Sequence, residues 1–141
     1  MTIDELNRIS KNSFSDRLGI VFTGFDGDRI TGEIHITENH LQPHGVVHGG
    51  VYISLAETLA GAGSIMLLAD EGKTALGTNI NSTHIAATRE GRIAGEALLV
   101  HRGAFKHIWD VKITDDNGKL ISMSRVSNSI RELKNQEEKR R

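Results

Sequence analysis

One carboxylate lies in the middle of an apolar segment, where soluble proteins seldom carry a charged side chain. Glu57 is flanked by Leu55, Ala56, Leu59 and Ala60, within the most apolar stretch of the sequence. An unpaired buried carboxylate is costly and its pKa normally rises, which suits a general base or nucleophile. The alternative is a helix whose polar edge passes through Glu57 and carries the side chain to solvent. Glu57 is our first candidate for a catalytic residue.

A glycine-rich segment precedes this carboxylate. Residues 41–50 read LQPHGVVHGG and end on the pair Gly49-Gly50, seven residues before Glu57. Glycines at the start of a helix expose backbone N–H groups at the positive end of the helix dipole, where an anion or a developing oxyanion binds. Glycine also allows a ligand carbonyl to approach closely. A plain flexible loop is the alternative, and the carboxylate that follows favours a site.

Three histidines in this segment have the spacing of metal ligands on a helix. His40, His44 and His48 are four residues apart. Pro43 and the neighbouring glycines disfavour a continuous helix there, so we expect no metal site. Three further histidines fall in strand-like segments and are expected at the surface or a sheet edge, namely His35, His101 and His107.

The elements that must position these residues follow from periodicity and turn signals. Thr2 and Glu5 match a capping box, so a short helix is expected there, with Leu6 and Ile9 facing inward. A long apolar helix is expected over about 50–70, ending at a Glu-Gly pair. Six strand-like segments are separated by turns such as Asn117-Gly118, namely 18–25, 29–37, 74–83, 92–102, 105–114 and 119–130.

This order predicts one α+β domain over residues 1–130, with an antiparallel sheet wrapped around one long central helix. A mostly apolar helix needs burial on nearly every side, and a curved sheet supplies it. The remaining segment, 131–141, has eight charged residues among eleven. We expect a helical extension there that frays into disorder.

Composition excludes several classes of function. The formal net charge of −1 gives no field that would attract nucleic acid or an anionic membrane. The absence of cysteine removes disulfides, thiolate metal sites and a cysteine nucleophile. The apolar stretch 51–69 is nearly long enough to span a membrane, but an ionised Glu57 at its centre would cost about 2.5–3.5 kcal/mol. We therefore expect a soluble cytoplasmic protein whose first residues lack the pattern of a signal peptide.

A family resemblance joins these observations. The residues that carry it are Gln42-Pro43, His48-Gly49-Gly50, Ala56-Glu57, Asn79-Ile80-Asn81, His84 and Arg89-Glu90-Gly91. Together they resemble the hotdog-fold thioesterase superfamily over roughly residues 18–130. The similarity is greatest to the aryl-CoA branch, which includes 4-hydroxybenzoyl-CoA thioesterase of the Arthrobacter type and the 1,4-dihydroxy-2-naphthoyl-CoA thioesterase of menaquinone synthesis.

The resemblance implies a role for each matching residue. Glu57 would attack the thioester carbonyl or activate water, and Gly49 would donate its backbone N–H to the carbonyl oxygen. Gln42 and His48 would orient the thioester and the attacking water, and His84 would lie near the CoA channel. Family members place the carboxylate of one subunit against the glycine loop of its neighbour. The resemblance thus implies a homodimer or a tetramer of paired dimers, with no cofactor beyond the CoA of the substrate.

The chain departs from the aryl-CoA branch one helical turn after Glu57. Those enzymes carry Ser or Thr there, whereas this chain has Gly61, and the nearby Thr58 and Ser64 are candidate substitutes. Basic side chains near the loops of the last strands suit the phosphates of CoA. The residues predicted to bind substrate or CoA are Gly50, Thr58, Gly61, Ser64, His84, Arg89, Arg102 and Lys106.

The leading hypothesis is an acyl-CoA thioesterase acting on an aromatic acyl group, with 1,4-dihydroxy-2-naphthoyl-CoA as the most specific candidate. Two alternatives belong to other classes. One is a hotdog hydratase or dehydratase of acyl thioesters, although the chain lacks a His-Phe-Pro-Gly-like loop. The other is a non-catalytic module that binds acyl-CoA.

Overall fold

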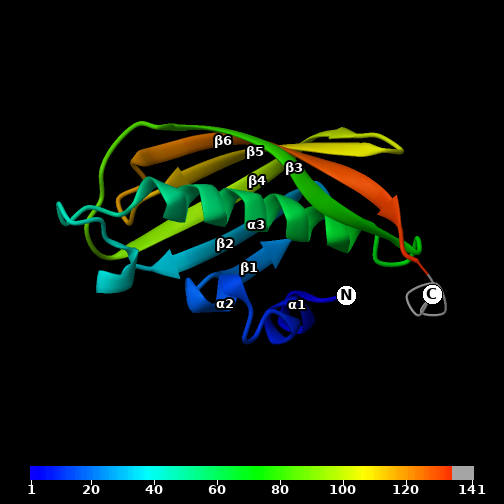
Figure 1. Ribbon diagram of the computed structural model, residues 1–141, viewed down its shortest axis with the longest axis horizontal. Coiled ribbons are helices and arrows are strands. Elements are labelled where there is room, and N and C mark those ends of the chain that lie inside the picture. Colours follow the sequence, from blue (N-terminus) through cyan, green and yellow to red (C-terminus); the bar gives the residue numbers. More distant parts are fainter. Residues whose placement is uncertain (135–141) are drawn as a thin grey trace.

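One antiparallel sheet and one long helix form the body of the protein. The computed structural model describes residues 1–134. The helix α3 (Gly49–Leu67) lies across one face of the sheet, while α1 (Ile3–Ile9) and α2 (Phe14–Arg17) lie beside β1 (Figure 1). The sheet has the strand order β1-β2-β4-β5-β6-β3. Its strands are β1 (Val21–Phe25), β2 (Arg29–His35), β3 (Lys73–His84), β4 (Arg92–Arg102), β5 (Lys106–Thr114) and β6 (Leu120–Glu132). The predicted α+β fold is confirmed.

The core lies between α3 and the sheet. Leu55 and Leu59 on α3 are fully buried, and burial of such side chains contributes about 1.5–3 kcal/mol each. Leu59 fits over Gly32 and Gly95, which face each other in β2 and β4. A Cβ atom on these glycines would lie 2.8 and 2.5 Å from the Leu59 methyl groups. Two strand glycines therefore let the helix approach the sheet closely.

The helix α3 is long and apolar enough to cross a membrane by length and composition. Half of its apolar window is buried inside the protein. The sheet therefore covers one side of the helix, and the other side carries Glu57, Thr58 and Gly61.

The short elements agree in part with the sequence predictions. The capping box is confirmed, because Glu5 N donates to Thr2 Oγ1 at 3.1 Å and Thr2 N donates to Glu5 Oε2 at 2.8 Å. The inward orientation of Ile9 was wrong, since that side chain is 60% exposed. The helix α2 was not predicted, because four residues are too few to show a helical period.

The last strand is longer than expected. β6 runs to Glu132. It pairs with the whole length of β3, from Lys73 opposite Glu132 to His84 opposite Ser122. The predicted helical extension was therefore wrong at residues 131 and 132, where the ladder with β3 continues the strand. The predicted disorder of the tail falls largely on residues 135–141, which lie outside the described residues.

A buried polar cluster joins α3 to β5 and β6. Ser64 Oγ accepts hydrogen bonds from Trp109 Nε1 at 2.9 Å and from Asn128 Nδ2 at 3.0 Å, and it lies 2.9 Å from His107 Nδ1. Because two donors occupy the hydroxyl lone pairs, the Ser64 proton points at Nδ1 of a neutral His107. His107 is buried. Its predicted surface position was wrong, because its partner Ser64 lies on the sheet side of α3.

This cluster makes stability depend on pH. Burial lowers the pKa of His107, and the positive charge of Arg102 lowers it further, with His101 acting in the same direction and Glu71 opposing both. The folded chain thus binds this proton less readily than the unfolded chain. The contribution of neutral His107 to stability is therefore complete above about pH 6.5, the pKa of histidine in the unfolded chain. It is lost as the pH falls below that value.

We expect the urea concentration at the midpoint of unfolding to decrease when the pH is lowered from about 7 to about 5, and to decrease less in His107→Gln. The matched control is His35→Gln, which changes an exposed histidine on β2 and should retain the wild-type pH dependence. An identical pH dependence in wild type and His107→Gln would contradict this account of the cluster.

Candidate active site

The start of α3 presents a free backbone donor. His48 caps the helix, because its Nδ1 accepts a hydrogen bond from Gly50 N at 2.8 Å, and Val51 N donates to His48 O at 2.9 Å. The first N–H groups of a helix have no partner within the helix. Among the described residues, Gly49 N–H has no hydrogen-bond partner. The predicted glycine start is confirmed, and it leaves one amide at the positive end of the helix dipole.

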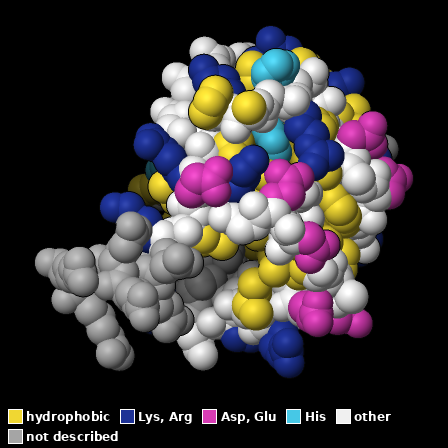
Figure 2. Space-filling view, turned by 90° about the vertical axis from the view of Figure 1, so that its right-hand side faces the viewer, with side chains coloured by type: hydrophobic (Ala, Val, Ile, Leu, Met, Phe, Trp, Pro, Cys, Tyr) yellow, Lys and Arg dark blue, Asp and Glu magenta, His cyan; other side chains and the backbone are white. Residues whose placement is uncertain are grey.

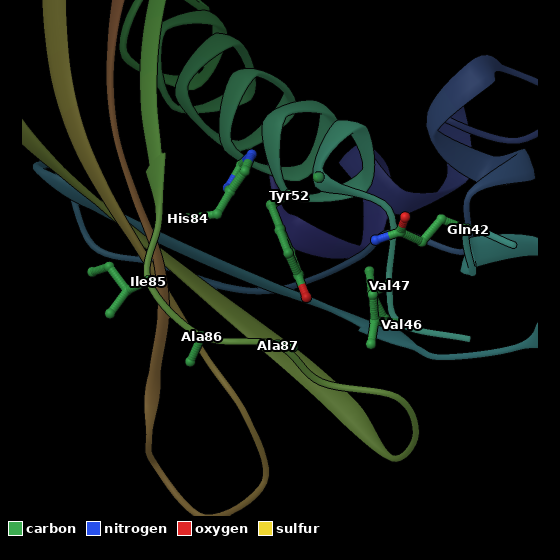
Figure 3. A pocket seen from close by; sticks show the side chains of 9 residues that line it. Gln42, Val46, Val47, Tyr52, His84, Ile85, Ala86 and Ala87 are labelled. Carbon is green, nitrogen blue, oxygen red and sulfur yellow. The ribbon is translucent and has the colours of Figure 1, made fainter. Parts of the chain in front are cut away.

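The loop before α3 is held in place by backbone hydrogen bonds. Gln42 N donates to Val46 O at 2.8 Å, and Val47 N donates to Thr88 O at 2.9 Å. An isolated bridge between Leu41 and Val47 closes the loop on itself. These bonds fix the backbone of Gln42 and orient its side chain toward the pocket in front of α3 (Figure 3).

This pocket has a volume of about 290 Å³ and brings three of the predicted residues together, Gln42, Gly49 and His84 (Figure 3). The His84 ring lies against Gly49, because a Cβ atom at Gly49 would be 2.8 Å from His84 Nε2. Ser122 Oγ holds the other ring nitrogen, Nδ1, at 2.9 Å. A carbonyl oxygen placed here would meet the Gly49 amide and the His84 ring together.

Tyr52 is a pocket residue that the sequence prediction missed. Its ring packs on His84 with a centroid distance of 5.3 Å and an interplanar angle of 56°, and it is buried. Burial raises the pKa of Tyr52, while the backbone of Thr88 partly offsets this effect. The available signal was an aromatic residue three positions after Gly49, which a helix places on the same face.

Glu57 lies farther along the same helix, in a different hollow. It is eight residues from Gly49, which is about 12 Å along a helix. Its predicted burial was wrong for the single chain, where Glu57 is exposed. Leu55 and Leu59 occupy the sheet-facing side of α3, so the helical period carries Glu57 to the uncovered side. The alternative, in which the polar edge of the helix carries Glu57 to solvent, is therefore correct for one chain.

The carboxylate of Glu57 lies over β3. A Cβ atom on Gly77 would be 2.5 Å from Glu57 Oε1, and the ladder of β3 with β6 shifts register between Gly77 and Asn79. Thr58 lines the same hollow as Glu57 and Gly77, and Gly61 lines a second hollow that Glu57 and Thr58 also border. Glu57, Thr58 and Gly61 thus form a group of their own, apart from Gln42, Gly49 and His84.

Two predicted substrate-binding residues are engaged inside the protein. Ser64 is fully buried and its hydroxyl is occupied by the polar cluster with His107, so its predicted role beside Glu57 was wrong. Seven residues are almost two helical turns, so Ser64 points in nearly the same direction as Glu57. Ser64 is buried because Trp109 of β5 and Asn128 of β6 cover that part of α3, whereas Glu57 lies over the edge strand β3. Gly50 donates its N–H to His48 and contributes to the site through that cap.

The basic residues predicted to bind CoA lie at opposite ends of α3. Arg89 is near the loop, since a Cβ atom on Gly45 would be 3.6 Å from its Nη1. Arg102 instead pairs with Glu71 at 3.0 Å and hydrogen-bonds to Leu67 O at the C-terminal end of the helix. Lys106 begins β5 in the same hairpin. Figure 2 views the protein from the side on which α3 ends, and Lys and Arg side chains lie next to Asp and Glu side chains on that face. Of these three predicted residues, Arg89 is the one near the loop that borders the Gly49 pocket.

Two histidines of the loop, His40 and His48, have structural roles. His40 is buried, accepts a hydrogen bond from Thr37 N at its Nδ1, and lies 2.7 Å from Leu18 O through its Nε2. His48 caps α3. Within residues 1–134, no group of three or more His, Asp or Glu side chains is arranged to bind a metal ion.

Comparison with known proteins assigns the class of this fold and site. The family model described as the thioesterase superfamily matches residues 44–122. A solved thioesterase from Haemophilus influenzae superposes with a TM-score of 0.91 at 32% identity, covering 96% of this chain and 94% of that one. A mutant thioesterase from Pseudomonas aeruginosa gives a TM-score of 0.88 at 30% identity, with coverages of 92% and 94%.

A relative from Haemophilus influenzae, named as a candidate esterase, is 35% identical over 130 residues, covering 92% of this chain and 93% of the relative. The expected hotdog architecture is confirmed by these structures. The chain belongs to the thioesterase superfamily, and it is a thioester hydrolase.

The contact between Gly77 and Glu57 yields a test of the site. Gly77→Ala places a methyl group 2.5 Å from Glu57 Oε1, which is too close for a non-bonded contact, so the carboxylate must move while the core is untouched. We expect thioester hydrolysis to fall by about 10²-fold, since a displacement of about 1 Å costs that much. Gly24→Ala in β1, whose Cβ would lie 3.1 Å from Thr31 Oγ1, is the matched control. Equal activities of the two variants, measured as thiol release, would show that the position of Glu57 is unimportant.

Proposed function

We propose that the protein hydrolyses acyl-CoA esters with Glu57 as the catalytic carboxylate. The observation that carries the proposal is the unpartnered Gly49 amide at the positive end of α3, beside Gln42 and His84. Such a donor stabilises the oxyanion that forms when a thioester carbonyl is attacked, and losing one typically costs about 2.7–4 kcal/mol of transition-state stabilisation. Thioesters are also the substrates of the superfamily to which the chain belongs.

The chemistry has two routes at Glu57. As a general base, the carboxylate takes a proton from water while the water oxygen bonds to the carbonyl carbon, and the C–S bond then breaks to release CoA thiolate, which takes up the proton. As a nucleophile, the carboxylate bonds to the same carbon, expels the thiolate and forms an anhydride that water cleaves. Gln42 is placed to orient the thioester carbonyl near Gly49, as the family resemblance implies.

Two chains are needed to complete this site. The separation of about 12 Å between Glu57 and Gly49 along α3 is too large for both to act on one carbonyl. β3 is an edge strand of the sheet. The other edge, β1, is capped by the Asn7 side chain, which bonds to both Phe22 N and Phe22 O at 2.9 Å. An uncapped twelve-residue edge favours pairing with another copy. We propose a homodimer through β3, with paired dimers as the tetramer.

The finer assignment of substrate comes from the family resemblance. We propose an aromatic acyl-CoA, with 1,4-dihydroxy-2-naphthoyl-CoA as the specific candidate, and Arg89 as the first contact for the CoA phosphates because it lies near the Gly49 pocket. No further cofactor is required for hydrolysis. A cytoplasmic location remains part of the proposal.

Substitution of the carboxylate tests the mechanism. We expect Glu57→Gln and Glu57→Ala to lower kcat by about 10²-fold or more, because each removes the base or nucleophile. The measurement is thiol release from a panel of aromatic and aliphatic acyl-CoA esters, with circular dichroism to confirm the fold. Near-wild-type hydrolysis by Glu57→Ala would refute the role of Glu57. Saturable binding without turnover by wild type would favour the acyl-CoA-binding module, and hydration of enoyl-CoA would favour the hydratase.

A complementation experiment tests the shared site. Glu57→Ala and Gly49→Pro, which removes the N–H donor at the first helical position and also displaces the His84 ring, are each expected to be inactive. When the two are coexpressed with different tags, an isolated heterodimer carries one intact site and should recover about half of wild-type activity. A heterodimer as inactive as its parents, or an active monomer, would place the whole site within one chain.

A further inference from the structure

His84 turns one edge of its ring toward the start of α3. It is the last residue of β3, it is exposed, and it lines the pocket in front of Gly49 (Figure 3). A Cβ atom on Gly49 would lie 2.8 Å from His84 Nε2 and 2.9 Å from its Cδ2. The edge that carries Nε2 therefore faces the backbone of Gly49, and its role depends on whether Nε2 carries a hydrogen.

Ser122 determines where that hydrogen lies. It is the partner of His84 in the ladder between β3 and β6, and its Oγ lies 2.9 Å from His84 Nδ1. The same hydroxyl lies 3.4 Å from Thr83 O, which is longer than an ordinary O–H···O hydrogen bond. The Ser122 hydroxyl therefore donates to Nδ1, and the neutral ring carries its hydrogen on Nε2.

Nε2 is a hydrogen-bond donor in both charge states of this arrangement. A neutral ring that accepts from Ser122 at Nδ1 has its hydrogen on Nε2, and a protonated ring has a hydrogen on each nitrogen. The other neutral tautomer would turn a lone pair toward Gly49, where it would repel a developing oxyanion. The hydrogen bond from Ser122 disfavours that tautomer, because Nδ1 must then be an acceptor.

Two buried residues hold the exposed ring in its orientation. Tyr52 packs against His84 with a centroid distance of 5.3 Å and an interplanar angle of 56°, and Ser122 binds Nδ1 from the neighbouring strand. Both supporting side chains are buried. The His84 ring therefore cannot turn without losing its hydrogen bond or its packing. A donor that is held in place before the reaction is the kind of group that stabilises charge developing in a transition state.

We propose that His84 is a second oxyanion donor, with Nε2–H acting beside the Gly49 N–H, and that Ser122 and Tyr52 are its positioning residues. The inference rests on the proposed function, which places the thioester carbonyl oxygen at Gly49. When the carbonyl carbon is attacked, its oxygen gains negative charge, and both donors bind it more strongly than they bind the thioester. When the C–S bond breaks, the carbonyl re-forms. His84 keeps its hydrogen throughout.

Kinetics of His84 variants test the donor. We expect His84→Leu to lower kcat by about 10²-fold, the loss typical of a missing oxyanion donor, while KM changes by less than about threefold. His84→Gln keeps an N–H donor on its side-chain amide and should recover about tenfold of that loss. The control is His35→Leu, which changes an exposed histidine on β2 and should hydrolyse like wild type. A higher KM at unchanged kcat in His84→Leu would overturn the proposal, because His84 would then only bind substrate.

A pair of serine variants tests the positioning role of Ser122. Ser122→Ala removes the hydroxyl that donates to Nδ1, so we expect kcat to fall by about tenfold at a similar KM. The matched control is Ser124→Ala, which removes the neighbouring cross-strand pair, where Ser124 Oγ lies 2.6 Å from Ser82 Oγ. This control should keep the kcat of wild type. Equal kcat values for the two variants would overturn the role of Ser122.

Nitrogen NMR reads the tautomer without any turnover. In protein labelled with ¹⁵N-histidine, the chemical shifts of the ring nitrogens distinguish an N–H from a lone pair, and the His84 signals are those missing from His84→Gln. We expect a neutral His84 to carry its hydrogen on Nε2 in wild type and to lose this preference in Ser122→Ala. A hydrogen on Nδ1 in wild type would overturn the proposal.

Tyr52 variants test the packing on the ring. Tyr52→Leu removes the aromatic ring beside His84, whereas Tyr52→Phe retains it, so we expect a larger fall in kcat in Tyr52→Leu. Circular dichroism checks that both variants are folded. A kcat that is equal in the two variants would overturn the positioning role of Tyr52.

Binding distinguishes failure of this donor from failure of the proposed function. Calorimetry on Glu57→Gln, with and without His84→Leu, compares benzoyl-CoA with S-benzyl-CoA, which has a methylene in place of the carbonyl. We expect His84→Leu to weaken binding of benzoyl-CoA by about two- to tenfold and to leave S-benzyl-CoA unchanged. That result supports the donor even if wild type shows no turnover. An equal effect on both ligands overturns the donor even if wild type hydrolyses every ester.

Discussion

Burial of one side of α3 against the sheet is the interaction on which the other features of the protein depend. Leu59 enters the gap over Gly32 and Gly95, so the helix cannot rotate about its axis without losing that fit. The same constraint places Thr58 and Gly61 on the uncovered side of α3 and directs Glu57 over the edge strand β3. The buried bonds of Ser64 with Trp109 and Asn128 hold the second half of the helix in register. The direction of each reactive group therefore follows from core packing.

The two ends of α3 have different roles because the helix dipole gives them opposite partial charges. At the N-terminal end, His48 accepts from Gly50 N and leaves Gly49 N–H beside His84 without a partner among the described residues. At the C-terminal end, Arg102 and Glu71 form an ion pair over the last carbonyls. A cation near those carbonyls interacts favourably with the helix dipole. The electrostatics of the helix thus favour chemistry at its start and a structural ion pair at its end.

Sequence reasoning predicted most of the fold, because its signals are local. Capping of α1, the glycine start of α3 and the Asn117-Gly118 turn depend on neighbouring residues, and an amphipathic period predicts which elements exist. The extension of β6 to Glu132 could not be predicted in this way. Its charged residues resemble a tail, and only the ladder with β3 makes them a strand. The four-residue α2 is capped locally by Ser13, but it is too short to show a helical period in the sequence.

The sequence by itself predicted which residues could do chemistry, Glu57 and Gly49 from their types and spacing, and Gln42 and His84 from the family resemblance. Only the tertiary structure decided how they group. It left Glu57 exposed over the edge strand β3 and buried Ser64 against β5 and β6, and it separated the carboxylate from the Gly49 amide. The physical reason is that a helical period gives the relative directions of side chains, but which direction is buried depends on the surface that the helix packs against. That surface is formed by strands far away in the sequence.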